Sequence, residues 1–83
     1  MASSIFYKAS VERDLRKLDR PVESRLLSKL EHTLSADPDA GEPLSGEFQG
    51  LFKLRVGDYR VIYAKAAEGV LVVRIRHSKN AYR

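Results

Sequence analysis

Residues 51–63 alternate apolar and basic side chains on both sides of the dipeptide Gly57-Asp58. Successive side chains of a β-strand point to opposite faces of its sheet, so this alternation is typical of strands that bury one face. A glycine-first pair between two such runs is typical of a two-residue hairpin turn. The segment therefore predicts two antiparallel strands, 51–56 and 59–65, and this hairpin limits how the rest of a short chain can pack.

Two helices are predicted upstream of this hairpin. Apolar residues recur at spacings of three and four over residues 11–18 and again over 22–34, as on the buried stripe of a helix. The first helix is expected to run for about ten residues with Ser10 as its cap, and the second to about Ser35. Because only a few residues separate them, the helices are expected to pack as an antiparallel hairpin.

The remaining segments complete a sheet. Residues 4–8 read as a short strand at an edge, and residues 35–47 as a loop rich in proline and glycine. Residues 70–76 read as the last strand after a turn near Gly69. We therefore predict one α+β domain over residues 1–83, with an N-terminal strand, a helical hairpin and a three-stranded antiparallel meander, its helices packed on one face of a four-stranded sheet.

Strict alternation is expected in the last strand. It would place Leu71, Val73 and Ile75 on one face, with Val72 and the arginines of residues 74 and 76 on the other. The last strand would then present both arginines on the same side of the sheet.

The positive charge lies in the C-terminal half of the chain. Residues 49–83 hold eight basic and two acidic side chains, a net charge of +6, whereas residues 1–48 have a net charge of −2. The outward positions of the predicted hairpin include Lys53, Arg55 and Arg60. A sheet face with clustered positive charge is suited to bind a polyanion, such as a nucleic acid or an acidic protein. The alternative is a solvated basic surface that serves solubility.

Composition excludes several other classes of protein. The chain has no cysteine, which excludes a disulfide framework and a thiolate metal site. His32 and His77 lie far apart in sequence and cannot alone make a metal site. We expect no metal and no other cofactor. No apolar stretch approaches membrane-spanning length, and the N-terminus lacks a basic-then-apolar signal. We expect a cytoplasmic protein that does not bind membranes.

Two segments resemble the RelE/ParE superfamily of type II toxin–antitoxin toxins. The run Pro43-Leu44-Ser45-Gly46, followed after a short gap by residues 52–63, is similar to the family pattern L-x-G … Y-K-L-R-x-G-x-Y-R-x-x-Y. Residues 74–82 are similar to the terminal pattern I-x-H-R-x-x-x-Y. They depart from it in Ser78, where a basic residue is common, and only Arg83 follows the tyrosine.

The resemblance implies one of two activities. RelE-type members are endoribonucleases that cut mRNA in the ribosomal A site, whereas ParE-type members share the fold and poison DNA gyrase without ribonuclease residues. For this chain it implies a ribosome-dependent endoribonuclease that contacts mRNA and the 16S rRNA of the ribosome, with a non-enzymatic gyrase inhibitor as the alternative. It also implies a cognate antitoxin partner and contact with operator DNA only through the antitoxin complex. A third reading is a degenerate toxin that only binds antitoxin and operator DNA.

The resemblance also assigns candidate residues. Arg60 and Arg76 match the phosphate-clamping arginines of the family, and Tyr82 matches its C-terminal tyrosine. Lys53 and Arg55 match the basic pair on the preceding strand. These five are the candidate catalytic residues, and their presence favours the RelE type. The candidate RNA contacts are Lys53, Arg55, Arg74, His77, Lys79 and Arg83.

Metal-free RNA cleavage needs proton transfer at two oxygens and stabilisation of the extra charge on the attacked phosphate. The guanidinium fork suits the phosphate, and Arg55 could hardly act as an acid or base. Lys53 and His77 are candidates for proton transfer. Tyr82 would orient the attacking hydroxyl or stack on a base. Each residue also has a structural alternative, such as a solubilising charge, an ion pair of Arg60 with an acid, or a packed ring at Tyr82.

Overall fold

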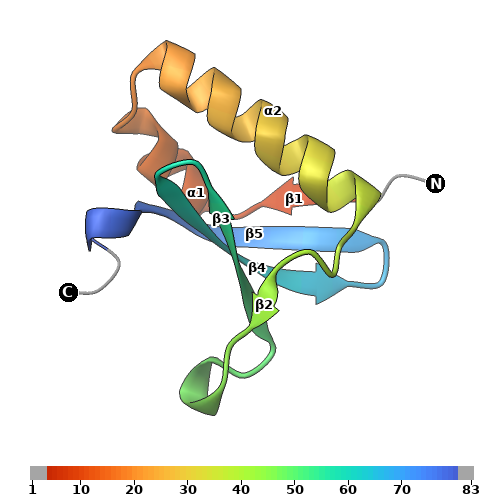
Figure 1. Cartoon of the computed structure of the whole chain (residues 1–83). Helices are drawn as coiled ribbons and strands as arrows, with labels where there is room; N and C mark the ends of the chain where they lie inside the picture. The colour runs from red at the N-terminus through yellow and green to blue at the C-terminus, as the bar shows by residue number, and fades with distance from the viewer. Residues whose placement is uncertain (1–3, 81–83) are drawn as a thin grey trace.

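The computed structural model describes residues 4–80 and has an α+β fold (Figure 1). Its elements in chain order are β1 (Ser4–Tyr7), α1 (Ala9–Arg16), α2 (Arg20–Ala36), β2 (Glu42–Pro43), β3 (Leu51–Val56), β4 (Tyr59–Ala66) and β5 (Gly69–His77). Two short 3-10 helices, η1 (Gly46–Phe48) and η2 (Ser78–Asn80), lie before β3 and after β5. The predicted order of strand, two helices, loop and meander is confirmed.

The five strands form one sheet in the order β1-β5-β4-β3-β2. β1 pairs with β5 in parallel at one edge, and the other neighbouring strands are antiparallel. The predicted strand number of four is wrong, because Glu42 and Pro43 form a further short strand opposite Lys53 and Phe52. An edge position tolerates this proline, which has no N–H to donate.

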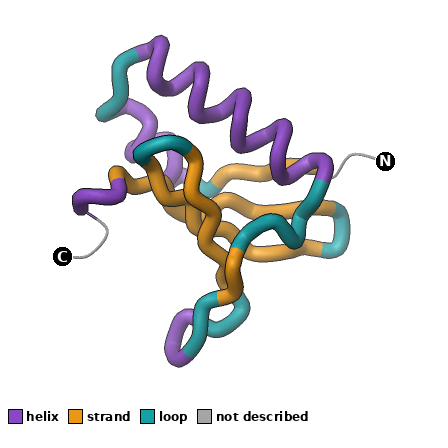
Figure 2. The backbone as a smooth tube through the Cα atoms, viewed as in Figure 1, coloured by secondary structure: helices purple, strands orange, loops and turns teal. Residues whose placement is uncertain are grey.

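Both helices lie on the same side of the sheet, as predicted, and α2 crosses its face (Figures 1 and 2). Leu26, Leu30 and Leu34 recur every four residues on α2 and are buried against the strands. The buried residues of the strands that complete this core are Val56, Val61, Tyr63, Val70, Val72 and Ile75. No helix between residues 4 and 80 has the length and apolar character needed to cross a membrane.

Helix α1 covers the edge of β5 beyond its pairing with β1, which ends at Val72. The Ser10 hydroxyl donates to the carbonyl oxygen of Val73 (2.6 Å), and a carboxylate oxygen of Asp14 accepts from the Ile75 N–H (2.9 Å). These side chains satisfy backbone groups that an uncovered edge strand would leave open. The predicted capping role of Ser10 is therefore wrong. The helix begins at Ala9 with Lys8 in the cap position, and the hydroxyl binds β5 instead.

A β-bulge interrupts β5. Ile62 pairs with Arg74 while Tyr63 pairs with Val72, which leaves Val73 as an extra residue. Because a bulge shifts the alternation by one residue, Val72 and Ile75 both face the core. The strict alternation predicted for this strand is wrong for that reason.

Candidate functional site

Three arginines form a row across the three inner strands of the sheet, close to the turn between β3 and β4. Arg60 on β4 lies directly opposite Arg55 on β3 and directly opposite Arg76 on β5. Directly opposed residues project to the same face, with Cβ atoms roughly 4.5–5.5 Å apart. Their neighbours Val61 and Ile75 point into the core, so the arginines point to the face away from the helices. The structure therefore brings together three predicted site residues, of which Arg76 is distant in sequence from the other two.

A second row lies beside the first. Ile62 is opposite Lys53 on one side and Arg74 on the other. The open face of the sheet thus combines five basic side chains with apolar ones. We call these five residues the basic face: Lys53, Arg55, Arg60, Arg74 and Arg76.

Two of the pockets that these residues line share Lys53 and Arg60. The first, which we call the Phe48 pocket, has a volume of about 470 Å³ and is lined by Leu44, Phe48, Leu51, Lys53, Arg60, Ile62, Val73, Arg74 and Arg76. The second, the Glu42 pocket, has a volume of about 330 Å³ and is lined by Ala40, Glu42, Lys53, Leu54, Arg55, Arg60 and Ser78. Lys53 and Arg60 line both, so the two pockets meet at the centre of the basic face.

The carboxylate of Glu42 lies beside the basic face. Its Oε2 atom is 3.9 Å from Nζ of Lys53; the glutamate is well exposed and the lysine is half-buried. An ion pair of this kind contributes little to stability because water screens it. The glutamate nevertheless places one acidic group at the rim of the Glu42 pocket, and the sequence did not predict this group. Glu42 was missed because it lies in a segment predicted as loop.

Arg74 differs from the other basic residues in its partner. Its Nε and Nη2 atoms donate to the two carboxylate oxygens of Asp14, at 3.1 and 3.2 Å. Burial of Asp14 would raise the pKa of its carboxyl, but hydrogen bonds from Ile75 N–H and Arg74, together with the charge of Arg76, hold that pKa below its usual value. Arg74 therefore also fastens α1 to β5. The sequence held a signal for this contact, because Asp14 lies three residues after the buried Val11 and therefore on the same, buried face of the helix.

The remaining predicted residues lie elsewhere. His77 is opposite Tyr59 and meets its ring edge-on, with centroids 5.1 Å apart, so it lies on the helix side of the sheet. Its Nδ1 atom accepts from the Lys79 N–H at 3.2 Å. The structure therefore does not bring His77 to the basic face, while Lys79 is exposed on η2. Tyr82 and Arg83 lie outside the described residues.

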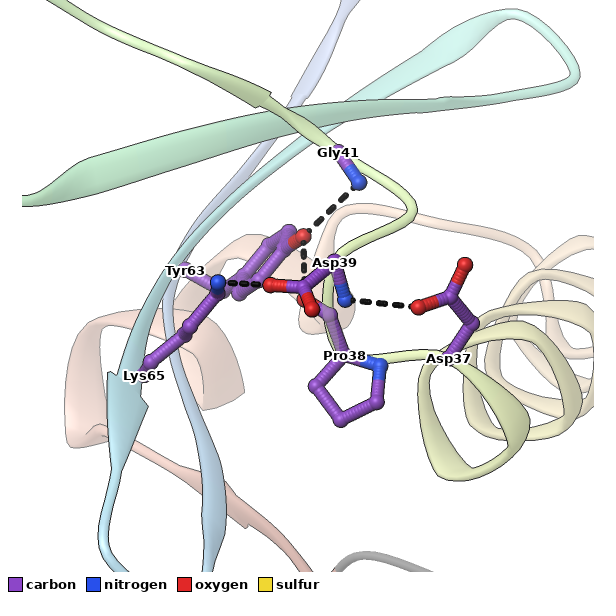
Figure 3. Close-up of polar contacts among 6 residues, drawn as sticks. All are labelled: Asp37, Pro38, Asp39, Gly41, Tyr63 and Lys65. Carbon is purple, nitrogen blue, oxygen red and sulfur yellow. Dashed lines mark hydrogen bonds and ion pairs between the residues drawn. The ribbon is translucent and has the colours of Figure 1, made fainter.

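A buried phenol fixes the loop that leads to β2 (Figure 3). The hydroxyl of Tyr63 donates to the carbonyl oxygen of Pro38 (3.0 Å) and accepts from the Gly41 N–H (2.9 Å). Lys65 pairs with Asp39 in the same loop. A Cβ atom at position 41 would lie 2.5 Å from the phenol oxygen, so only glycine fits there. These contacts hold β2, and with it Glu42, against β3.

The chain belongs to the family described as ParE toxin of type II toxin–antitoxin system, parDE, whose model matches residues 5–82. The fold and the basic face thus belong to a toxin of a type II toxin–antitoxin system. No curated protein matches the chain. Among the residues described, no three histidine, aspartate or glutamate side chains are grouped to hold a metal ion.

Solved structures with the same fold include toxin–antitoxin complexes. The chain is similar to a chain of the RelBE2 complex from Mycobacterium tuberculosis, at 29% identity and a TM-score of 0.85, over 93% of this chain and 92% of that one. It shares 21% identity and a TM-score of 0.72 with a chain of the RelE–RelB complex from Pyrococcus horikoshii, over 98% and 100%. For the RelBE complex of E. coli the identity is 21% and the TM-score 0.70, over 92% and 96%.

Proposed function

We propose that this toxin is a metal-independent endoribonuclease that cuts mRNA in the ribosomal A site. The row formed by Arg55, Arg60 and Arg76 is the observation that supports this proposal. Like charges directly opposite one another on a sheet are destabilising. A phosphodiester bound between the guanidinium groups would relieve that repulsion, and the guanidinium fork bonds two phosphate oxygens at once.

The proposed reaction is attack of a ribose 2′-oxygen on the neighbouring phosphorus. The 2′-hydroxyl loses its proton, the bond to the 5′-oxygen breaks, and that oxygen leaves with a proton. The products are a 2′,3′-cyclic phosphate and a 5′-hydroxyl end. Arg60 and Arg76 would stabilise the extra negative charge on the phosphate in the transition state. We assign proton transfer to Lys53, which has Glu42 beside it at the pocket rim. Tyr82 would orient the attacking hydroxyl.

The partners follow from the same proposal. The toxin would act in the cytoplasm on ribosome-bound mRNA, next to 16S rRNA. A cognate antitoxin with an acidic, amphipathic segment would cover the basic face and so block RNA, and operator DNA would be bound only through that complex. Three of the similar solved structures are complexes of toxin with antitoxin, which supports such a partner.

Arginine substitutions test the proposal. We expect Arg60→Ala and Arg76→Ala each to lower cleavage of ribosome-bound mRNA by about 10²–10³-fold, because each removes a donor to the transition state. Both should also relieve growth inhibition. Arg13→Ala is the matched control, since Arg13 is an exposed arginine of α1. Unchanged cleavage and unchanged toxicity in the two variants would refute the nuclease proposal.

The second candidate function is inhibition of DNA gyrase by binding. The match to the ParE toxin family favours it. The arginine row weighs against it, because a protein that only binds gyrase does not need three guanidinium groups arranged around one anion. A supercoiling assay with purified gyrase separates the two candidates.

A further inference from the structure

The apolar half of the Phe48 pocket has no part in the proposed chemistry. Leu44, Phe48, Leu51, Ile62 and Val73 form its apolar lining, and four basic residues form the rest. From this arrangement we propose that the pocket is a nucleobase subsite, in which the ring of Phe48 stacks on a base of the RNA whose phosphate the arginines bind. This inference rests on the proposed function.

The exposure of Phe48 is the first observation behind this assignment. Phe48 is 54% exposed, the highest value among the large apolar residues described. Within residues 4–80 it stacks on no other ring, whereas Phe52 and Tyr63 stack on each other and Tyr59 meets His77. An aromatic face that is left open in this way is available to a planar ligand.

The chain is built to hold Phe48 at this place. A hydrogen bond from the Leu44 N–H to the Leu51 carbonyl oxygen (2.9 Å) closes the loop that contains η1. Gly46 and Gly50 have φ angles of 70° and 97°, in the left-handed region that favours glycine. The loop therefore turns back sharply at both of its ends, and Phe48 comes to line a pocket on the open face.

The charges around the ring suit a nucleotide. Arg60 and Arg76 line the same pocket as Phe48, so an anion bound to them would share that pocket with the aromatic ring. A nucleotide joins a phosphate to an aromatic base through a single sugar, and proteins that bind single strands commonly pair a basic groove with stacking side chains. The volume of about 470 Å³ is within the range of small-molecule sites.

A binding experiment without cleavage tests the inference. The probes are short single-stranded RNAs with 2′-deoxy residues throughout the cut region, and a matched series with an abasic residue at each position in turn. Affinity is measured by fluorescence anisotropy at one fixed salt concentration. We expect Phe48→Ala to weaken binding about 10-fold, as stacking energies indicate. Phe48→Trp should retain the affinity of the wild type. The one RNA that lacks the stacked base should bind the wild type and Phe48→Ala with equal affinity.

Phe6→Ala is the matched control. Phe6 is the other large apolar side chain with high exposure, at 46%, but it lies on β1 and does not line the pocket. We expect this variant to bind RNA like the wild type. The inference is overturned if Phe48→Ala binds every RNA as the wild type does, or if its loss is the same on every abasic RNA. Failure of the wild type to bind any of the RNAs overturns it as well.

A protein ligand is a separate outcome. If Phe48→Ala leaves RNA affinity unchanged and weakens binding of a synthetic amphipathic helix of leucine and glutamate, the pocket is a protein-docking surface and the inference is wrong. The nuclease proposal is judged by Arg60→Ala and Arg76→Ala on ribosomes. If those two substitutions abolish mRNA cleavage but Phe48→Ala leaves RNA affinity unchanged, only the stacking inference is rejected. If Phe48→Ala weakens RNA binding as expected but the wild type cuts no mRNA on ribosomes, only the nuclease proposal is rejected.

Discussion

At the scale of single residues, the basic face depends on a side chain that points away from it. Tyr63 is fully buried on the core side of β4, yet its hydroxyl binds the loop that leads into β2. Burial raises the pKa of this phenol, so the hydroxyl keeps its proton near neutral pH and donates it to Pro38. The position of Glu42 beside Lys53 is thus linked to one phenol oxygen.

Tyr63→Phe tests this link. The ring would stay packed, but the Pro38 carbonyl oxygen and the Gly41 N–H would lose a partner in a part-buried place. We expect the free energy of unfolding, measured with urea, to fall by about 1–3 kcal/mol. Tyr7→Phe is the control, because its hydroxyl bonds Glu31 in an exposed position and its loss should cost less. Equal effects of the two substitutions would contradict the proposed role of Tyr63.

At the scale of elements, the contact that Asp14 makes between α1 and β5, which we call the α1–β5 joint, positions the strand that carries Arg76. Asp14 accepts hydrogen bonds from the Ile75 N–H and from Arg74, and its side chain is only 8% exposed. The bulge at Val73 lies at the same joint. Together they set the register in which Arg76 lies opposite Arg60.

The pH dependence of stability tests this joint. A carboxyl whose pKa is lowered by folding stabilises the native state above its unfolded pKa, near 4, and this contribution is lost as the pH falls through the folded pKa. We expect Asp14→Asn to lower the free energy of unfolding at pH 7 by roughly 1.5–3 kcal/mol, because the charged hydrogen bonds are lost.

The acid range provides the second part of that test. Below about pH 4 the wild type should lose stability more steeply than Asp14→Asn, since the variant has no proton to take up at this site. Glu12→Gln, an exposed position on the same helix, should follow the wild type throughout. An Asp14→Asn protein with the stability and acid response of the wild type would show that the joint contributes nothing.

The sequence predicted those helices and strands whose apolar spacing matches the side chains that the fold buries. The alternation of residues 51–63 and the leucine spacing of α2 were sufficient for the hairpin and the second helix. The short strand β2 could not be predicted, because its two residues pair only once β3 is in place. The bulge at Val73 was also hidden, since the unbroken apolar run of residues 70–73 is compatible with either register.

The candidate site was predictable in part for the same reason. Arg55 and Arg60 occupy outward positions of regular strands, and Arg76 follows the bulge of β5 at a position that still alternates with the buried Ile75, so the pattern was sufficient to place them on one face. Phe48 lies on a loop whose path depends on two glycines with left-handed φ angles, and no periodicity reports such a path. Asp14 was recognisable as an acid on the buried stripe of a helix. Its partner Arg74 could not be predicted, because it lies on a strand 60 residues further along the chain.

At the scale of the whole molecule, the fold separates stability from function. The helices and the core lie on one side of the sheet, and the basic face lies on the other. Substitutions of Lys53, Arg55, Arg60 and Arg76 should therefore change activity with little effect on folding, in contrast to substitutions of Tyr63, of Asp14 and of its partner Arg74. The same division leaves the basic face uncovered by the helices.

The most direct measurement presents the purified toxin with both possible targets in parallel. One reaction contains ribosomes programmed with a defined mRNA, and the other contains DNA gyrase with relaxed plasmid. We predict that the mRNA is cut in the A-site codon, leaving a 5′-hydroxyl on the downstream fragment, while supercoiling proceeds normally. Intact mRNA together with blocked supercoiling would contradict the account.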